Sequence, residues 1–572
     1  MRVKSISINH FRSISDIELT FPEGKPLVLF GPNNAGKSNI IAAIHRFLGE
    51  YYPPNINMLD SDWFMRDKAK YSSCEIGCVF DSPYAKGNCA LWVHYETEPA
   101  KCEFRDSYGQ KVWVNNDERR AIQSFLVDAE RSIGYQLSYS SRFTLLSKFS
   151  HAVHGAIDDA GKKALKESFE EIKTVFKGIP EYSEFADAFT NTISDAVQGF
   201  AHHLEVDFSA YDPNNYANAM RILAKEGNDV RTFEEFGTGE QQVLLMAFAK
   251  AYMEVFGAES VILILEEPEA HLHPLAQRWL KEYIYGLCAS GMQIVVSTHS
   301  ADFLDPSNLQ GLVKVSKDAF GTTHAIQLGP GELVRQCIEN GVPSNKISEL
   351  GVADHYAARL TPDSLKGLFA KTVLLVEGAT EFFALPIYLA NAGCSFAKEN
   401  IEIINCGGKQ SIPAYARLFS AYGIRVFCLF DCDRGKDNEE ISSYLGLGTM
   451  ETQGSGFVLG NDWAYNIKDF EDTLRLQVPE YVNLENEAMN VYKVSGKPAT
   501  AYVAARLCVT IPRFVNDLAN ALKGGTSPSL ASTPAQPGPK EQALATDPWR
   551  DDSLYQMESF NSFPDEADDI PF

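Results

Sequence analysis

Two groups of residues have the types and spacing needed to handle phosphates and metal ions, and the first is Gly31-Pro32-Asn33-Asn34-Ala35-Gly36-Lys37-Ser38. The apolar run before it, 26–30, predicts a buried strand, and apolar residues at helical spacing follow over 39–47. A glycine-rich turn between a strand and a helix directs backbone N–H groups at a phosphate. We expect Lys37 to contact the terminal phosphates and Ser38 to hold Mg²⁺. The stretch predicts a P-loop, with Asn33, Asn34 and Gly36 among its nucleotide contacts.

Two carboxylates and a histidine come later, each at the end of an apolar run that predicts a buried strand. The run 261–265 ends in Glu266 and Glu267, and the run that begins at 293 ends beside His299. Buried parallel strands bring their carboxyl ends to one edge of a sheet, so these side chains should meet the phosphates. We expect Glu266 near Mg²⁺ and Glu267 to orient or deprotonate the attacking water. P-loop ATPases commonly have an aspartate at the position that Glu266 occupies here. Whether Glu266 binds the metal ion directly therefore stays open.

The order of these motifs resembles the ATP-binding heads of ABC-type ATPases, above all those of the SMC and RecF type. Gly237, Thr238 and Gly239 precede a predicted helix and resemble the signature motif, which completes the phosphate site of the opposite subunit. The resemblance therefore implies ATP and a homodimer or higher homo-oligomer. It assigns His299 to sensing the terminal phosphate and Arg12, in the sequence Phe-Arg-Ser, to a nucleotide contact. A plain surface role for Arg12 stays open, and no glutamine stands at a clear Q-loop position.

The second group of residues begins at Glu377. It follows a predicted strand, 372–376, and Glu381 comes four residues later on a predicted helix. Another predicted strand, 425–430, ends in Asp431-Cys432-Asp433. Because alternate residues of a strand share a face, we expect both aspartates to point at one site. Hard carboxylates at the carboxyl ends of parallel strands favour Mg²⁺ or Mn²⁺.

The glutamate and Asp-x-Asp motifs are similar to those of a Toprim domain. An ABC-type ATPase followed by a Toprim domain resembles the OLD (overcoming lysogenisation defect) family of bacterial nucleases, to which the Gabija antiphage nuclease also belongs. The resemblance covers about residues 1–520. It implies Glu471 as a further metal ligand and Lys497 as the basic residue beside the scissile phosphate. It also implies DNA as the substrate, two ions at the Toprim site, one at the ATP site, and a companion protein or nucleic acid in a defence system.

These features favour an ATP-regulated, divalent-metal-dependent DNA endonuclease, with Glu267, Glu377 and Lys497 as its catalytic residues. A topoisomerase would need a nucleophilic tyrosine domain and a bacterial primase usually brings a zinc module, and we find neither pattern. Two other functions stay open: an ATP-switched DNA-binding clamp of the recombination-mediator kind, and a sensor that releases a separate effector. Since mere DNA binding needs no catalytic lysine, the complete set of carboxylates with Lys497 argues for cleavage.

The predicted fold class is α/β: an ABC-type (SMC/RecF-like) ATPase head with a helical insertion, then a Toprim α/β domain and a disordered acidic tail. The expected boundaries are 1–116 and 216–340 for the two ATPase lobes, 117–215 for the insertion, 341–370 for a helical connector, 371–523 for the Toprim domain and 524–572 for the tail. Mixed charge at helical spacing marks the insertion. We expect it to be a dimerisation module.

Composition narrows the class of protein. A net charge of −24 over 572 residues argues against a broad nucleic-acid-coating surface, although a local basic groove remains compatible with it. No run of 18 apolar residues occurs and the N-terminus opens directly into a predicted strand, so we expect neither a membrane span nor a signal peptide. The eleven cysteines are scattered without paired CxxC motifs. We expect reduced thiols in a cytoplasmic protein.

The tail differs in composition from the rest of the chain. Four prolines occur by position 539 among Ser, Thr, Gly and Ala, which predicts a flexible linker. Its acidic end, closing with Ile570-Pro571-Phe572, resembles the C-terminal tip of bacterial single-stranded-DNA-binding protein. Such a tip suits docking into a small apolar pocket with a basic rim. We expect the tail to engage proteins that bind such tips or to fold back over the DNA groove, with an ordinary solvated terminus as the alternative.

Overall fold

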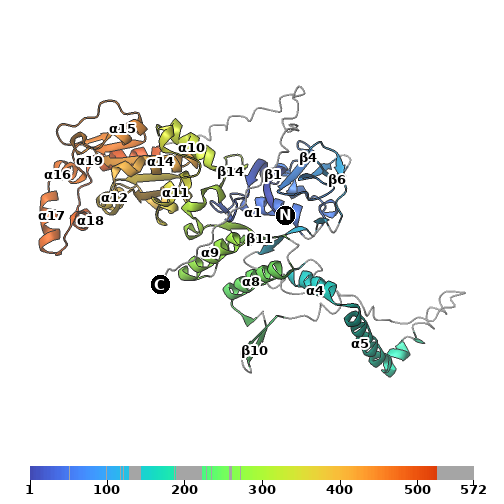
Figure 1. Ribbon diagram of the computed structural model, residues 1–572. Coiled ribbons are helices and arrows are strands. Elements are labelled where there is room, and N and C mark those ends of the chain that lie inside the picture. Colours follow the sequence, from blue (N-terminus) through green and yellow to red (C-terminus); the bar gives the residue numbers. More distant parts are fainter. Residues whose placement is uncertain are drawn as a thin grey trace, which may run out of the picture. The chain divides into compact units, whose positions relative to one another are not determined.

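In a computed structural model of the chain (Figure 1), both predicted sites lie within residues 1–524. The described residues are 1–49, 52–97, 100–115, 118–119, 121–127, 144–185, 187–188, 222–226, 229–232, 235–256, 260–270 and 272–524. The predicted tail from 525 onward and much of the predicted insertion lie outside these residues.

Twelve described strands form the sheet of the ATPase head, in the order β7-β6-β5-β4-β1-β2-β14-β13-β3-β12-β11-β8. The strands β13, β3, β12, β11 and β8 run parallel, so the segments that follow β3, β11 and β12 lie at one edge. The bounds are β1 Val3–Phe11, β2 Ile14–Thr20, β3 Leu27–Phe30, β4 Ser73–Phe80, β5 Ala90–Thr97, β6 Ala100–Arg105, β7 Lys111–Val112, β8 Ile122–Val127, β11 Ser260–Glu266, β12 Gln293–Thr298, β13 Leu312–Lys317 and β14 Thr323–Gln327.

Helix α1 (Lys37–Leu48) begins directly after the P-loop and buries Ile40, Ile41 and Ile44 against the sheet. These residues repeat at helical spacing, which gives the helix one apolar face. Helix α8 (Thr238–Phe256) contacts β11, and α9 (Pro274–Ala289) contacts β12. The fold thus places the predicted motif helices next to the strands that carry the other ATPase motifs.

The expected start of the helical insertion at residue 117 is wrong. Strand β8 lies parallel to β11 and completes the parallel part of the sheet, so the first lobe extends to at least Val127. Gln123 and Ser124 interrupt the apolar run and concealed the strand, yet both are buried. Ser124 pairs its Oγ with His45 Nδ1 at 3.0 Å, which satisfies the polar group inside the fold. Further along lie α4 (Leu145–Ala156), α5 (Asp159–Lys177) and the hairpin of β9 (Leu223–Glu226) and β10 (Asp229–Thr232).

The second sheet contains five strands in the order β16-β15-β17-β19-β18. Strands β16, β15, β17 and β19 are parallel, so the segments after β15 and β17 meet at one edge. The strand bounds are β15 Thr372–Val376, β16 Ile401–Asn405, β17 Arg425–Asp431, β18 Phe457–Leu459 and β19 Trp463–Asn466. The helices are α12 Ala379–Asn391, α13 Phe396–Glu399, α14 Ile412–Ala421, α15 Glu439–Leu445, α16 Phe470–Gln477, α17 Tyr481–Asn490, α18 Lys497–Leu507 and α19 Arg513–Gly524.

The two sheets share a seam at Tyr422, the residue that ends α14. Its ring packs edge-on against Phe30, the last residue of the P-loop strand, with ring centroids 5.8 Å apart. Lys314 of β13 donates from Nζ to the Tyr422 carbonyl at 3.0 Å, and burial lowers the pKa of Lys314 to about 8. One buried apolar cluster includes residues of both sheets and of the connecting helices α10 (Pro330–Glu339) and α11 (Val352–Ala357). None of the described helices is long and apolar enough to cross a membrane.

Candidate functional site

The P-loop adopts a backbone shape that only glycine permits at its two ends. Gly31 has φ 143° and Gly36 has φ 110°. A Cβ on Gly31 would lie 2.1 Å from the Val315 carbonyl oxygen, and one on Gly36 would lie 2.1 Å from Thr323 Oγ1. Either substitution would collide with the neighbouring strands, so both glycines are required by packing as well as by conformation. The loop they allow brings Lys37 to the first position of α1.

Lys37 is buried among backbone oxygens and the other two ATPase side chains. Its Nζ donates to the carbonyls of Gly31 and Pro32 at 3.0 and 3.1 Å and lies 2.8 Å from His299 Nε2. The same His299 nitrogen lies 3.2 Å from Glu267 Oε1. Burial lowers the pKa of Lys37 to about 8, against the opposing effect of the nearby glutamates. Residues predicted from three separate motifs therefore meet at one point.

A further glutamate, Glu269, holds the histidine in place. Its Oε1 accepts from Thr298 Oγ1 at 2.6 Å and from the His299 backbone N–H at 2.8 Å. Glu267 has φ 46°, so the chain turns sharply between the end of β11 and this anchor. The sequence contains the signal in Glu-Glu-Pro-Glu, but the partner of Glu269 is remote in the chain. Glu266, the last residue of β11, lies close enough to Lys37 to raise its pKa.

Arg12 is supported by a buried carboxylate. Its Nε pairs with Asp62 Oδ1 at 3.1 Å, and Arg46 Nη2 pairs with the other oxygen of Asp62 at 2.8 Å. Arg12 Nη1 reaches Asn39 Oδ1, two residues into the P-loop helix, at 3.5 Å. The arginine is thus fixed beside the P-loop with about a third of its side chain exposed. The sequence pattern identified Arg12 and missed Asp62.

The remaining predicted nucleotide contacts lie on two different elements. Asn33, Asn34 and Ser38 are on the P-loop and at the start of α1, and Asn34 accepts from Lys317 Nζ at 3.3 Å. Gly237 and Gly239 lie at the start of α8 and line a hollow with Leu272 and Trp279. The side chain of Thr238 lies outside the described part of the structure. The described lining of the hollow includes no P-loop residue.

In the second sheet, two predicted ligands lie at adjacent strand ends. Glu377 follows β15, and its Oε2 accepts from the Asp431 backbone N–H at 3.1 Å. Asp431 ends β17, and its Oδ1 accepts from Asn466 Nδ2 at 2.9 Å. Burial raises the pKa of both carboxyls, and repulsion from neighbouring carboxylates adds to the rise. The hydrogen bonds fix both side chains at the edge where the parallel strands end.

Glu381 and Glu471 come to the same place from two helices. Glu381, in the first turn of α12, accepts from the Gly378 N–H, and burial raises its pKa to about 7, with Glu377 and Glu471 adding repulsion. Glu471, in the first turn of α16, is buried, and its Oε1 has no hydrogen-bond partner. Lys497 Nζ lies 3.7 Å from that oxygen, and the lysine is 73% exposed. Of the three acidic residues at 469–472, Glu471 is the one whose charge reaches Glu381.

We predicted that strand alternation would point Asp433 at the same site as Asp431, and that reason is wrong. Strand β17 ends at Asp431, and Asp433 begins a short turn with φ 47°, so strand alternation does not orient it. Lys409 orients it instead. The Lys409 Nζ donates to Asp433 Oδ2 at 2.6 Å and to the Asp431 carbonyl at 3.2 Å. This lysine stands in the Gly-Gly-Lys sequence after β16, and no sequence pattern assigned it a role.

The five acidic residues form a donor set suited to a hard divalent cation. All offer carboxylate oxygens, which Mg²⁺ and Mn²⁺ prefer. Burial is the main cause of the raised pKa values of Glu381 and Asp431, and repulsion from neighbouring carboxylates adds to it. Within the described residues, no three His, Cys, Asp or Glu side chains are gathered closely enough to hold an ion in this arrangement. Local partners account for this, since Asp433 turns to Lys409 and Glu377 to the Asp431 amide.

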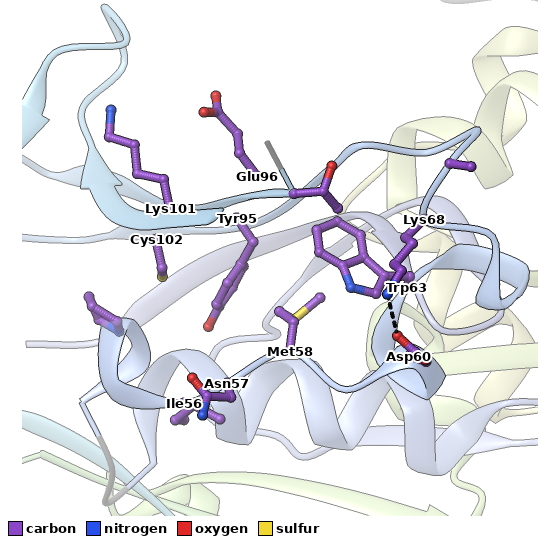
Figure 2. Close-up of a pocket in the computed structure, with 13 residues that line it drawn as sticks. Ile56, Asn57, Met58, Asp60, Trp63, Lys68, Tyr95, Glu96, Lys101 and Cys102 are labelled. Carbon is purple, nitrogen blue, oxygen red and sulfur yellow. Dashed lines mark hydrogen bonds and ion pairs between the residues drawn. The ribbon is translucent and has the colours of Figure 1, made fainter. Parts of the chain in front are cut away.

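A separate cavity of about 610 Å³ lies in the first ATPase lobe. Figure 2 shows its wall, where Trp63, Tyr95 and Met58 point inward and Lys68 pairs with Asp60. The other charged rim groups are also paired: Lys101 with Glu103, and Glu96 with His94 and Arg105. Because one wall is the segment that carries Asp62, the cavity borders the support of Arg12 rather than the phosphate position itself.

The fold and these two sites define a P-loop ATPase joined to a Toprim domain. A family model of the overcoming lysogenization defect protein-like TOPRIM domain matches residues 368–433, and an AAA ATPase domain model matches 1–104 and 94–304. The chain is 32% identical over 472 residues to the Old nuclease of Escherichia phage P2, covering 76% of this chain and 77% of that protein. The chain belongs to the OLD nuclease family.

A second nuclease and a solved structure are also similar to parts of the chain. An OLD nuclease of Thermus scotoductus is 26% identical over 455 residues, covering 75% of this chain and 82% of its own. The Smc head domain with an extended coiled coil, bound to the C-terminal domain of ScpA derived from Pyrococcus furiosus, shares 15% identity with a TM-score of 0.37. It covers 59% of this chain and 98% of its own. The homologues support a nuclease, and domains of these two types generally use a nucleotide and a divalent metal.

Proposed function

We propose that the protein is an ATP-regulated, divalent-metal-dependent DNA endonuclease. The observation that carries the proposal is that Glu377, Glu381, Asp431, Asp433 and Glu471 lie at the strand ends and helix starts of one sheet edge, with Lys497 3.7 Å from Glu471. Neighbouring carboxylates at such an edge attract divalent cations. A DNA-binding clamp has no need of the exposed lysine at this position, so cleavage is favoured over binding alone.

The chain's own residues divide the work of phosphodiester hydrolysis. A bound pair of Mg²⁺ or Mn²⁺ ions would supply an activated water and stabilise the leaving oxygen. The carboxylates would hold the ions, and their helix and strand positions keep the oxygens at one edge of the sheet. Lys497, weakly held by Glu471 and mostly exposed, would reach the scissile phosphate and neutralise charge that grows in the transition state.

The ATPase half would bind the nucleotide through Lys37 and the P-loop backbone, with Arg12 contacting it from the side. Lys37 already has a lowered pKa and short contacts, so a phosphate would replace backbone carbonyls as its partner. Glu267, held near His299, would orient or deprotonate the attacking water. Gly237, Thr238 and Gly239 would then act on the phosphates of a second subunit, which requires at least a homodimer.

The helical insertion offers a surface for that homodimer. Ile172 and Val175 on α5 are 49% and 69% exposed, a placement that costs free energy unless another apolar surface covers it. Replacing both with aspartate should shift the protein toward monomer in size-exclusion chromatography with light scattering. Lys166→Asp, on the charged side of the same helix, should leave the oligomer unchanged. A double variant that kept the wild-type mass would place the interface elsewhere.

The direct test of the proposed activity is plasmid cleavage with Mg²⁺ or Mn²⁺, across ATP concentrations and on linear, nicked and supercoiled DNA. Cleavage that requires the metal and is lost in Glu377→Ala would support the nuclease. Lys497→Ala should lower the rate far more than the DNA affinity measured by fluorescence anisotropy. Tight DNA binding without any cleavage would favour the clamp alternative instead.

We propose that the enzyme acts in the cytoplasm in antiphage defence, alone or with a companion component. This proposal rests on the resemblance to the Gabija antiphage nuclease. The cysteines are all free and mostly buried, as a reducing compartment permits. The acidic tail would add a docking peptide for proteins that bind single-stranded-DNA-binding-protein tips. Removing 568–572 and measuring plaque formation, cleavage and pull-down of such proteins tests this. A truncation that changes none of the three would leave the tail as a solvated terminus.

A further inference from the structure

Lys409 contacts three of the acidic residues of the Toprim site, Glu377, Asp431 and Asp433, and has no part in the mechanism above. Gly407 and Gly408, with φ 71° and 142°, turn the chain after β16 so that Lys409 enters the site. A Cβ on either glycine would meet no neighbour within 4 Å, so the backbone conformation itself requires glycine. The side chain of Lys409 is only 7% exposed.

Three strand ends are joined through this one residue. Its backbone N–H hydrogen-bonds the Glu377 carboxylate after β15, and its Nζ donates to the Asp431 carbonyl at the end of β17. Its shortest contact, 2.6 Å, goes to Asp433 Oδ2, whereas the Asp433 side chain is 45% exposed. Asp433 and Arg434 both have positive φ, so the lysine holds a turn that the backbone alone disfavours.

The charge of Lys409 also replaces a cation. A buried ammonium group is stable only when paired, and here it pairs with an oxygen that the proposed function gives to a divalent ion. A divalent ion bound to Asp433 would share that carboxylate with a like charge. Electrostatic repulsion between the two cations weakens the binding of the ion, as a like charge weakens the binding of a proton.

We propose that Lys409 is an exchangeable counter-cation of the nuclease site, which holds Asp433 in place and releases it when a divalent ion binds. Lys409 is thus a positioning residue that lowers the affinity for the second ion and keeps the ion-free site folded. This inference rests on the proposed metal-dependent nuclease. It adds that Lys409 sets the concentration of divalent ion at which the site is filled.

The test compares Lys409→Met with the wild-type full chain, with Mn²⁺ as the probe. Methionine keeps much of the length and removes the charge. We expect the affinity for Mn²⁺, measured by electron paramagnetic resonance and calorimetry, to rise about tenfold, because one adjacent like charge is removed. In EDTA the melting temperature should fall, and saturating Mn²⁺ should raise it by more than in the wild type. Lys409→Arg, which keeps the charge, should retain the wild-type affinity.

The matched control is Lys468→Met. Lys468 lies in the same domain and pairs with Asp472 at 2.8 Å, a carboxylate outside the predicted ligand set. It should leave the Mn²⁺ affinity unchanged. If Lys409→Met folds poorly, Lys409→Gln gives the same comparison. In an Asp433→Asn background the Lys409 substitution should no longer tighten Mn²⁺ binding, since the contested oxygen is gone.

The outcomes separate this inference from the proposed function. A wild-type chain that binds Mn²⁺ and cuts DNA, with Lys409→Met binding Mn²⁺ no more tightly, would overturn the counter-cation role alone. Equal loss of melting temperature with and without Mn²⁺ would also overturn it, because that pattern marks a purely structural residue. A wild-type chain that bound no Mn²⁺ would overturn the proposed metal-dependent nuclease and this inference together.

Discussion

The ATP site and the Toprim site bury charge of opposite sign for the same physical reason. At the first, burial lowers the pKa of Lys37 to about 8; at the second, burial raises the pKa of Glu381 to about 7. In both, the folded protein disfavours the charged form until a ligand of the opposite charge arrives. The sign of the buried charge agrees with the ligands that we propose: phosphate at Lys37 and a metal cation at Glu381.

The two sites also differ in how far they are assembled. His299 already contacts both Lys37 and Glu267, at 2.8 and 3.2 Å. The Toprim carboxylates are instead held apart by local partners, with Lys409 on Asp433 and Asn466 on Asp431. Backbone carbonyls can surround a single ammonium group at little cost, whereas several carboxylates repel one another.

Asp431→Asn is expected to give the largest difference between the effects on DNA cleavage and on ATP turnover. It should lower metal-dependent cleavage by roughly a thousandfold or more, since losing one preorganised electrostatic group alone costs about 10²–10³ in rate. ATP turnover should stay within about twofold of the wild type, because Asp431 lies on the other sheet. Plasmid nicking and phosphate release measure the two. Asp437→Asn, in the exposed turn after β17, is the control and should cut normally.

The next largest change is expected for Lys37→Met. Loss of the buried ammonium group should weaken ATP binding by about 100-fold, close to 3 kcal/mol, as expected for a charge-assisted contact. Titration with a fluorescent ATP analogue measures this. Lys25→Met, a lysine of the same lobe that donates to the Ser307 carbonyl, should bind normally. Complete loss of ATP-independent cleavage in Lys37→Met would contradict the separation of the two sites.

Glu267→Gln should divide binding from hydrolysis within the ATP site. The amide cannot take a proton from water, so turnover should fall by about 100-fold or more while nucleotide affinity is kept. Steady-state phosphate release and the same binding titration measure the two quantities. Unimpaired turnover would show that another group, with Glu269 as the nearest candidate, handles the water.

The smallest expected effect is a change of folding stability with pH. The slope of stability against pH should have opposite signs for the titrating groups of the two sites. In EDTA, the folded chain holds a proton on Glu381 up to about pH 7, above its ordinary pKa of 4.5. Folding stability should therefore decrease as pH rises between these two values, with a slope of at most about 1.4 kcal/mol per pH unit. Lys37 has a lowered pKa, so its contribution to stability should increase between pH 8 and 10.5.

Thermal unfolding without metal or nucleotide tests both signs. Glu381→Gln should flatten the curve between pH 5 and about 7, and Lys37→Met should flatten it above 8. Both neutral substitutions should also raise the melting temperature near pH 8, where each removes an unfavourable buried charge. If the melting temperature of Glu381→Gln changes with pH as that of the wild type does, the Glu381 carboxyl does not cause the pH dependence between pH 5 and about 7.

Sequence patterns located the site residues that end strands or begin helices. The P-loop, Glu267, His299, Glu377 and Asp431 fall where an apolar run stops, and parallel strand order then gathers them. Such residues are predictable because their position depends on local periodicity. Strand β8 was missed because its buried polar pair broke that periodicity.

Residues whose role depends on a remote partner were not predictable. Lys409 meets Asp433 across 24 positions, and Glu269 meets His299 across 30. Gly-Gly-Lys at a parallel strand end was a visible signal for a turn into the site, yet nothing in the sequence shows which carboxylate the lysine reaches. The turn at Asp433 was also not predictable. The sequence predicted that the strand continues through Asp433, whereas the backbone turns there with a positive φ.

The seam at Tyr422 has a consequence for how the molecule unfolds. Phe30 contacts both Tyr422 and Phe369, and one buried cluster runs through both sheets, so separating the halves would expose apolar surface on each, although each half also has a buried cluster of its own. Calorimetry of 1–524 should show one cooperative transition, and a fragment beginning at 371 should aggregate through its uncovered α14 face. Substitutions on either side of Tyr422 therefore have to be compatible with the residues across the seam.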